Sequence, residues 1–347
     1  MDPSVYIPAY LERTYLASHP ELTDAARELV HNDISANPHK YAQSEHAQAL
    51  LSYAGVHRHL LDELHRIEDM GSDEEFEQTR NRLFDDMRDE LLKIVRIDAL
   101  AVDAQLLAII LADTPVDACL GDLMKLETST ADYLQQSVSG FDMEAPHYWA
   151  NNVLADGVTA ADLTVSEPAL IGWLHTLEAI SQLCMASARY RAAANYARRV
   201  LKAEGYPTRA AGTVLLALAR LEDQDGFFAL AHQLEEQMGA DALENSPWYL
   251  LARTILLFKT NKMRPATRAL REFANRCEGG AFFLLNPMYQ TPYLPCRPEP
   301  RDPWDLSHQA VWEADGIISD TPDFAPWANA CEDVSQLAQE FARRYGF

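Results

Sequence analysis

The chain has 347 residues, 48% of them hydrophobic, and a formal net charge of −23. This apolar content excludes a disordered chain, and the longest apolar run, residues 106–112, is far shorter than the ~20 residues that span a membrane. The 52 acidic residues outnumber the 29 basic ones. This negative charge repels a phosphate backbone and argues against nucleic acid as a partner. Because the first residues show no signal-peptide pattern, we expect a soluble, cytoplasmic, acidic protein that binds neither membranes nor nucleic acid.

Two long helices are predicted in the N-terminal region, residues 1–98. The first begins at Ser44, a residue type that commonly caps helices, and has apolar residues at helical spacing. The second covers residues 72–97, where Ser72 and Glu75 stand at the spacing of a capping box. We therefore expect residues 1–98 to form an acidic helical region.

The first of these helices carries the sharpest candidate for a metal site, in the sequence HRHLLDELHRIED. His59 and Glu63 are four residues apart, and His65 is three residues from Asp62, so each pair shares a helix face. Carboxylate–histidine metal sites on helices use this spacing. His59, Glu63 and His65 would then make the protein a metal-dependent enzyme or regulator. A solvated, charge-paired helix surface is the reading that we favour.

A long helical array is predicted over residues 99–285. It begins with a helical pair, 101–113 and 115–136, in which Pro115 suits the first position of a helix. The interval 139–168 has no helical rhythm and is expected to be an irregular insertion. Helical periodicity then resumes.

One helix face recurs within this array. The first copy has one aromatic residue followed by small residues at helical spacing, and the second copy lies 73 residues later, close to two units of ~34 residues. The two copies are Tyr190, Ala193, Ala197 and Val200, and Met263, Ala266, Leu270 and Phe273. A middle copy that fits the pattern less well lies between them. The small residues let two helices approach closely, which predicts repeated helical hairpins.

The stretch from residue 85 to residue 287 resembles the tetratricopeptide-repeat (TPR) family through this recurrence. The segments PHYWANNVL, PALIGWLHTLEAI and WYLLARTILLFK, in this order, are also similar to bacterial repeat proteins of the suppressor-of-tumorigenicity type. The resemblance implies an all-α, TPR-like α-solenoid of antiparallel hairpins. Residues 286–347, which begin with a proline-rich bridge, would supply its C-terminal capping helices.

In the TPR family the first helices of the hairpins line a concave groove that binds protein or peptide segments. We align the groove positions of the family with this sequence, using Tyr190 and Met263 as anchors. The resemblance then implies five candidate peptide-binding residues: His175, Glu178, Gln182, Tyr249 and Arg253. The lysine and asparagine carboxylate clamp of some relatives is not recognisable here.

Charge is distributed unevenly along the chain. Residues 62–90 carry twelve acidic side chains against four arginines, whereas 187–276 is rich in arginine. One reading is a groove for an acidic peptide. Another is complementarity with the acidic helices of the same chain or of a second chain. Solvated outer faces of second helices are the third reading.

Common signatures of chemistry are absent from the sequence. The five cysteines are widely spaced without a CxxC pair, and no GxxxxGK[ST], GxGxxG, GxSxG or EF-hand motif occurs. We therefore expect a non-enzymatic helical-repeat scaffold without a cofactor, which binds a protein or peptide, including acidic ones, through its concave surface. A metal-dependent enzyme or regulator and a structural homodimer are the alternatives.

Overall fold

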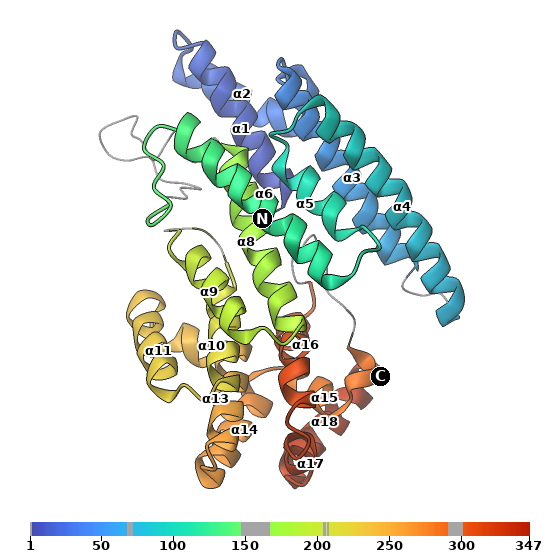
Figure 1. Ribbon diagram of the computed structural model, residues 1–347, viewed down its shortest axis with the longest axis vertical. Coiled ribbons are helices and arrows are strands. Elements are labelled where there is room, and N and C mark those ends of the chain that lie inside the picture. Colours follow the sequence, from blue (N-terminus) through green and yellow to red (C-terminus); the bar gives the residue numbers. More distant parts are fainter. Residues whose placement is uncertain (1, 68–71, 147–166, 204–205, 207, 291–300) are drawn as a thin grey trace. The chain divides into compact units, whose positions relative to one another are not determined.

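The computed structural model describes residues 2–67, 72–146, 167–203, 206, 208–290 and 301–347 (Figure 1). Of these residues, 79% are helical, and no strand occurs among them. The predicted all-α class is therefore confirmed for this part of the chain. Within the same part, no helix is both long and apolar enough to cross a membrane.

The chain divides into two compact units. Unit 1 comprises Met1–Ala179 with Lys202–Pro207 and Pro295–Pro298, and unit 2 comprises Ile180–Leu201, Thr208–Leu294 and Glu299–Phe347. The boundaries expected after residues 98 and 285 therefore fall inside unit 1 and unit 2, respectively. The irregular insertion expected at 139–168 lies mostly outside the described residues.

Unit 1 is built from helices that the sequence caps well. Its helices are α1 (Pro3–Ser18), α2 (Asp24–Ala36), the 3₁₀ helix η1 (Pro38–Lys40), α3 (Glu45–Ile67), α4 (Asp73–Ile97), α5 (Val102–Ile110), α6 (Val116–Ser137) and the first part of α8 (Pro168–Ala186). As expected, the Ser44 hydroxyl accepts a hydrogen bond from the third residue of α3, at 3.1 Å, and Ser72 accepts one from the Glu75 amide at 3.5 Å. Pro115 precedes α6 as its N-cap instead of opening it.

The core of unit 1 forms where these helices pack in pairs. The long helices α3 and α4 lie side by side (Figure 1), and Leu60 of α3 and Leu91 of α4 are fully buried. Gly172 allows α8 to approach α5, because a Cβ atom at this position would lie 2.6 Å from the Val102 Cβ. This approach brings polar residues of α5 and α8 together.

Unit 2 covers most of the stretch in which repeats are predicted, together with the C-terminal helices. Its helices are the end of α8, α9 (Tyr190–Leu201), α10 (Ala210–Arg220), α11 (Gln224–Met238), α12 (Ala240–Glu244), α13 (Pro247–Lys259), α14 (Met263–Arg276), α15 (Gly280–Leu285), the 3₁₀ helix η2 (Pro287–Tyr289), α16 (Asp305–Ser319), α17 (Phe324–Asn329) and α18 (Glu332–Tyr345). Helix α10 packs against α9, α11 and α13, and α13 packs against α14.

Three turns of the same geometry join α8 to α9, α10 to α11 and α13 to α14. Each contains one non-glycine residue in the left-handed region: Ala188, Glu222 and Asn261, with φ of 59°, 59° and 57°. The amide that follows each of them donates to the carbonyl five residues earlier, at 2.7, 3.1 and 2.9 Å. This is the Schellman ending of a helix. The turns are 34 and 39 residues apart, which together reproduce the 73-residue recurrence.

Aligning the helices on these turns shows which side chains repeat. The equivalent positions of α9, α11 and α14 are Tyr190, Gln224 and Met263; Ala193, Phe227 and Ala266; Ala197, Ala231 and Leu270; and Val200, Leu234 and Phe273. All residues of the last three sets are buried, whereas the first set is buried only at its tyrosine. The middle copy matches less well because a phenylalanine replaces the alanine of the other two.

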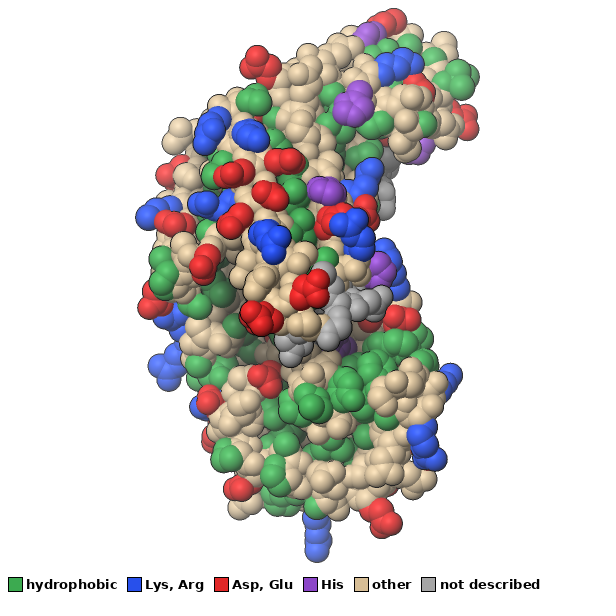
Figure 2. Space-filling view, turned by 90° about the vertical axis from the view of Figure 1, so that its right-hand side faces the viewer, with side chains coloured by type: hydrophobic (Ala, Val, Ile, Leu, Met, Phe, Trp, Pro, Cys, Tyr) green, Lys and Arg blue, Asp and Glu red, His purple; other side chains and the backbone are tan. Residues whose placement is uncertain are grey.

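The C-terminal residues pack as a cluster of aromatic rings in unit 2. Eight rings contribute: Phe282, Phe283, Tyr289, Trp304, His308, Phe341, Tyr345 and Phe347. Within residues 286–347, where C-terminal helices are expected, the structure has α16, α17 and α18. Figure 2 shows hydrophobic side chains gathered on the surface of this unit. Among the described residues, Met288 is the most exposed large hydrophobic one.

Candidate functional site

Two of the predicted peptide-binding residues, His175 and Glu178, lie on α8 in unit 1 and are engaged within the protein. His175 Nδ1 lies 2.9 and 3.0 Å from the two carboxylate oxygens of Asp103. The Tyr6 hydroxyl donates to Asp103 Oδ2 at 2.6 Å. The Tyr206 hydroxyl donates to Glu178 Oε2 at 3.0 Å. Both predicted residues therefore bridge elements of unit 1.

The Asp103 carboxylate is the centre of this polar network. Burial acts to raise the pKa of Asp103, but the facing His175 and the hydrogen bonds from His175 and Tyr6 outweigh it, so the pKa is lowered. Burial, followed by the charge of Asp103, raises the pKa of Tyr6 well above its usual value. The arrangement holds an ionised carboxylate between α1, α5 and α8.

The other three predicted peptide-binding residues lie in unit 2. Gln182 is half-buried near the end of α8. The Tyr249 ring stacks against Phe227 of α11, with ring centres 6.0 Å apart. Arg253 Nη1 lies 3.0 Å from Glu272 Oε2 of α14, and its guanidinium is 6.0 Å from the Tyr249 ring centre. Tyr249 and Arg253 are thus brought together, and both contact second helices of the pairs.

Helix α16 packs along the first helices α10 and α13. Arg209 donates to Gln309 of α16. Glu313 of α16 accepts hydrogen bonds from the Thr213 hydroxyl and, at 2.6 Å, from Trp248 Nε1. The sequence contains a signal for this contact: the two acceptors on α16, Gln309 and Glu313, are four residues apart and share one helix face.

This contact is an integral part of unit 2. Ala310, Val311 and Ala314 of α16 are fully buried. Gly212 of α10 lets Trp248 approach, since a Cβ atom there would lie 2.3 Å from the indole Cγ. An external segment would therefore have to displace a buried helix in order to reach this face of α10 and α13.

Many of the cations between residues 187 and 276 are paired inside unit 2. The pairs are Arg220 with Asp320, Arg253 with Glu272, Lys259 with Glu222, Arg271 with Asp333, and Arg276 with Glu244. The acids that neutralise these side chains belong to unit 2 itself. Much of the basic bias of this stretch is therefore balanced locally.

Four arginines of the same stretch are different. Arg191 and Arg198 on α9 and Arg264 and Arg268 on α14 are exposed, and none of them forms an ion pair with any residue that the structure describes. Arg191 and Arg264 occupy equivalent positions of the two helices, 73 residues apart. We call these four residues the outer arginines, and they leave positive charge available on a strongly acidic chain.

The candidate metal ligands are not gathered into a site in the described part of the chain. His59 and His65 are exposed on α3, while Glu63 accepts a hydrogen bond from Arg66. His57 is buried beside the Tyr53 ring, on another face of the helix. Among the described residues, no group of three or more His, Cys, Asp or Glu side chains is placed to hold a metal ion.

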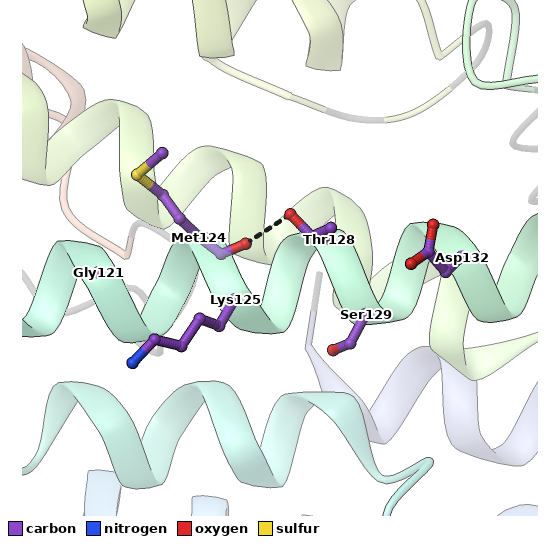
Figure 3. A pocket seen from close by; sticks show the side chains of 6 residues that line it. All are labelled: Gly121, Met124, Lys125, Thr128, Ser129 and Asp132. Atoms are coloured by element: carbon purple, nitrogen blue, oxygen red, sulfur yellow. Dashed lines mark hydrogen bonds between the residues drawn. The ribbon is translucent and has the colours of Figure 1, made fainter.

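A shallow hollow of about 530 Å³ lies along α6 (Figure 3). Its lining residues all belong to this one helix: Gly121, Met124, Lys125, Thr128, Ser129 and Asp132. The Thr128 hydroxyl donates to the Met124 carbonyl at 2.9 Å, and Lys125 Nζ lies 2.8 Å from Asp122 Oδ1. These polar groups are engaged within α6, so the hollow lacks the convergent groups of a ligand site.

No protein-family model, no curated protein and no solved structure matches this chain. The function must therefore be inferred from the contacts described above.

Proposed function

We propose that the protein is a non-enzymatic scaffold of TPR-like helix pairs that binds an acidic segment of another protein. The observation that carries the proposal is the set of outer arginines, which are exposed and have no acidic partner in the described part of a chain with a net charge of −23. A local positive region on such a chain attracts opposite charge.

The TPR-like arrangement is supported by the repeated turns and by the side chains aligned on them. A spacing of 34 residues between the first two turns is the length of a TPR unit. Helix pairs of this kind stabilise one another by packing against their neighbours, and they expose long surfaces suited to binding extended partners.

We place the binding surface on the outer faces of the second helices α9 and α14. On the first helices, α16 covers part of α10 and α13, and Arg253 is paired with Glu272. On α14, Arg264 and Arg268 stand four residues apart and so project from one face, separated by about 6 Å along the axis. Two carboxylates four residues apart on a partner helix have the same spacing.

Exposed ion pairs are individually weak, so a partner also needs apolar contacts. Leu221, Phe228 and Met263 are large hydrophobic residues with 37%, 45% and 37% of their surface exposed. Lys262 donates to Gln224, which holds the beginning of α14 next to the beginning of α11. An acidic segment with one or two apolar side chains would match this combination.

The test is binding of a synthetic helix that carries glutamate pairs four residues apart and two leucines, followed by fluorescence anisotropy. The probe should bind the full chain and lose at least about tenfold in affinity in the variant Arg264→Glu/Arg268→Glu. The matched control is Arg58→Glu/Arg343→Glu, which makes the same change in net charge at exposed positions on other helices. Equal binding by both variants would reject the proposed surface, because affinity would then depend only on net charge.

A further inference from the structure

The acidic face of α4 is the counterpart of the outer arginines on the same chain. Seven carboxylates on this helix are exposed: Glu74, Glu75, Glu77, Asp85, Asp86, Asp89 and Glu90. None of them forms an ion pair among the residues that the structure describes. Figure 2 views the side on which α3 and α4 lie in Figure 1, and it shows groups of acidic side chains there.

The spacing of these carboxylates matches that of the arginines on α14. Asp85 and Asp89 are four residues apart, as are Arg264 and Arg268. Both pairs therefore project from one helix face with the same separation of about 6 Å. Helix α4 also carries the exposed cations Arg82, Lys93 and Arg96, which lie on either side of the four carboxylates between residues 85 and 90.

We propose that the outer arginines bind α4 of a second copy of this chain. The inference rests on the proposed function, because it uses the same surface and names an acidic helix of this protein as the partner. The two complementary surfaces are different parts of the chain, so the contact is heterologous and joins copies head to tail. A dimer formed in this way still offers one unused α4, on one copy, and one unused set of arginines, on the other, so assembly continues beyond a dimer unless the geometry closes a ring.

The net charge of −23 gives this assembly an unusual salt dependence. At ~0.01 M salt the screening length is ~30 Å, and the overall repulsion between two acidic copies opposes contact. At ~0.15 M it is ~8 Å, so distant charges are screened while paired charges still attract. At ~1 M it is ~3 Å, and the pairs themselves are weakened. Association is therefore strongest at intermediate salt.

Sedimentation velocity of the full chain over a range of concentrations tests the proposal. Two variants with neutral substitutions isolate the two surfaces. One replaces the four outer arginines with glutamine, and the other is Asp85→Asn/Asp86→Asn/Asp89→Asn/Glu90→Gln. The wild type should associate with increasing concentration, most strongly near 0.15 M salt, and each variant alone should stay monomeric. Circular dichroism and urea midpoints like those of the wild type confirm that both variants fold.

The decisive arm is an equal mixture of the two variants. One variant supplies only an intact α4 and the other only intact arginines, so the mixture should form dimers that do not grow further. A monomeric wild type at all salt concentrations, or neutral variants that associate as the wild type does, would overturn the inference. If the wild type is monomeric but the acidic probe still binds through Arg264 and Arg268, the partner is a different protein and the proposed function stands. A wild-type chain that does not bind the acidic probe would instead reject the proposed function itself.

Discussion

Ala193 and Ala266 lie at the same position of two repeated helices, and both are fully buried. Replacing either one with leucine adds three carbon atoms where a neighbouring helix is already in contact. We expect Ala193→Leu and Ala266→Leu each to lower the free energy of unfolding by ~1–3 kcal/mol, measured by urea denaturation. Ala229→Leu is the matched control, because Ala229 is exposed on α11 and should change stability by less than about 0.5 kcal/mol. Equal midpoints at all three positions would show that the buried alanines are not in tight packing.

Glu313 accepts hydrogen bonds from two other helices, through Thr213 and Trp248. In Glu313→Ala the buried indole N–H of Trp248 loses its acceptor, which costs about 1–3 kcal/mol of stability. The intrinsic fluorescence of the folded protein should also change, since the environment of this indole is altered. Glu332→Ala, an exposed acid on α18, is the control. A stability loss no larger than that of the control would mean that α16 is not held by this contact.

Asp103 gives the protein a specific response to acid. Its pKa is lowered in the folded state, so its contribution to stability is fully present above the unfolded value of about 3.9 and is lost as pH falls through the lower folded value. The unfolding free energies of the wild type and Asp103→Asn should therefore differ most near pH 7 and converge below about pH 4. The exposed Asp122→Asn should show little difference from wild type at either pH. A gap between wild type and Asp103→Asn that stays constant with pH would contradict this account.

The turn at Ala188 tests the repeated element as a unit. Ala188 has a φ of 59°, a conformation that penalises residues with a Cβ atom and not glycine. We expect Ala188→Gly to raise the free energy of unfolding by about 0.5–1 kcal/mol. Ala186→Gly, two residues earlier in the last turn of α8, should instead lower it by up to ~1 kcal/mol. Urea denaturation should therefore show changes in the free energy of unfolding that have opposite signs for the two alanine-to-glycine substitutions. Changes of the same sign would contradict the Schellman geometry.

The sequence was sufficient for most of the elements that have strong caps and long periodic faces. The helix predicted over residues 72–97 is α4 within one residue, because Ser72 marks its start. Helix α1 was not identified, since Pro8 lies inside it and its hydrophobic residues do not form a clear stripe.

The candidate site was predicted less well than the elements. The basic stretch was recognised from charge alone, but which arginines are paired depends on acids such as Asp333, which is 62 residues from Arg271. The groove residues came from a family register, and the structure shows that Trp248, the neighbour of Tyr249, contacts α16. Local pattern indicates which face a residue shares, but it does not identify the helix that covers this face.

The outer arginines carry positive charge that has no acidic partner among the residues that the structure describes. The central claim is that Arg264 and Arg268 contact carboxylates of a bound segment directly, in addition to any effect of net charge.

A double-mutant cycle measures this contact most directly. Binding by calorimetry is compared for the wild type and Arg264→Gln/Arg268→Gln, each with a helical probe that carries one glutamate pair and with the same probe carrying glutamines. Direct contact predicts a coupling free energy of about 0.5–3 kcal/mol between the two changes. Effects that add within about 0.3–0.5 kcal/mol would contradict the claim, since the arginines and the carboxylates would then act independently.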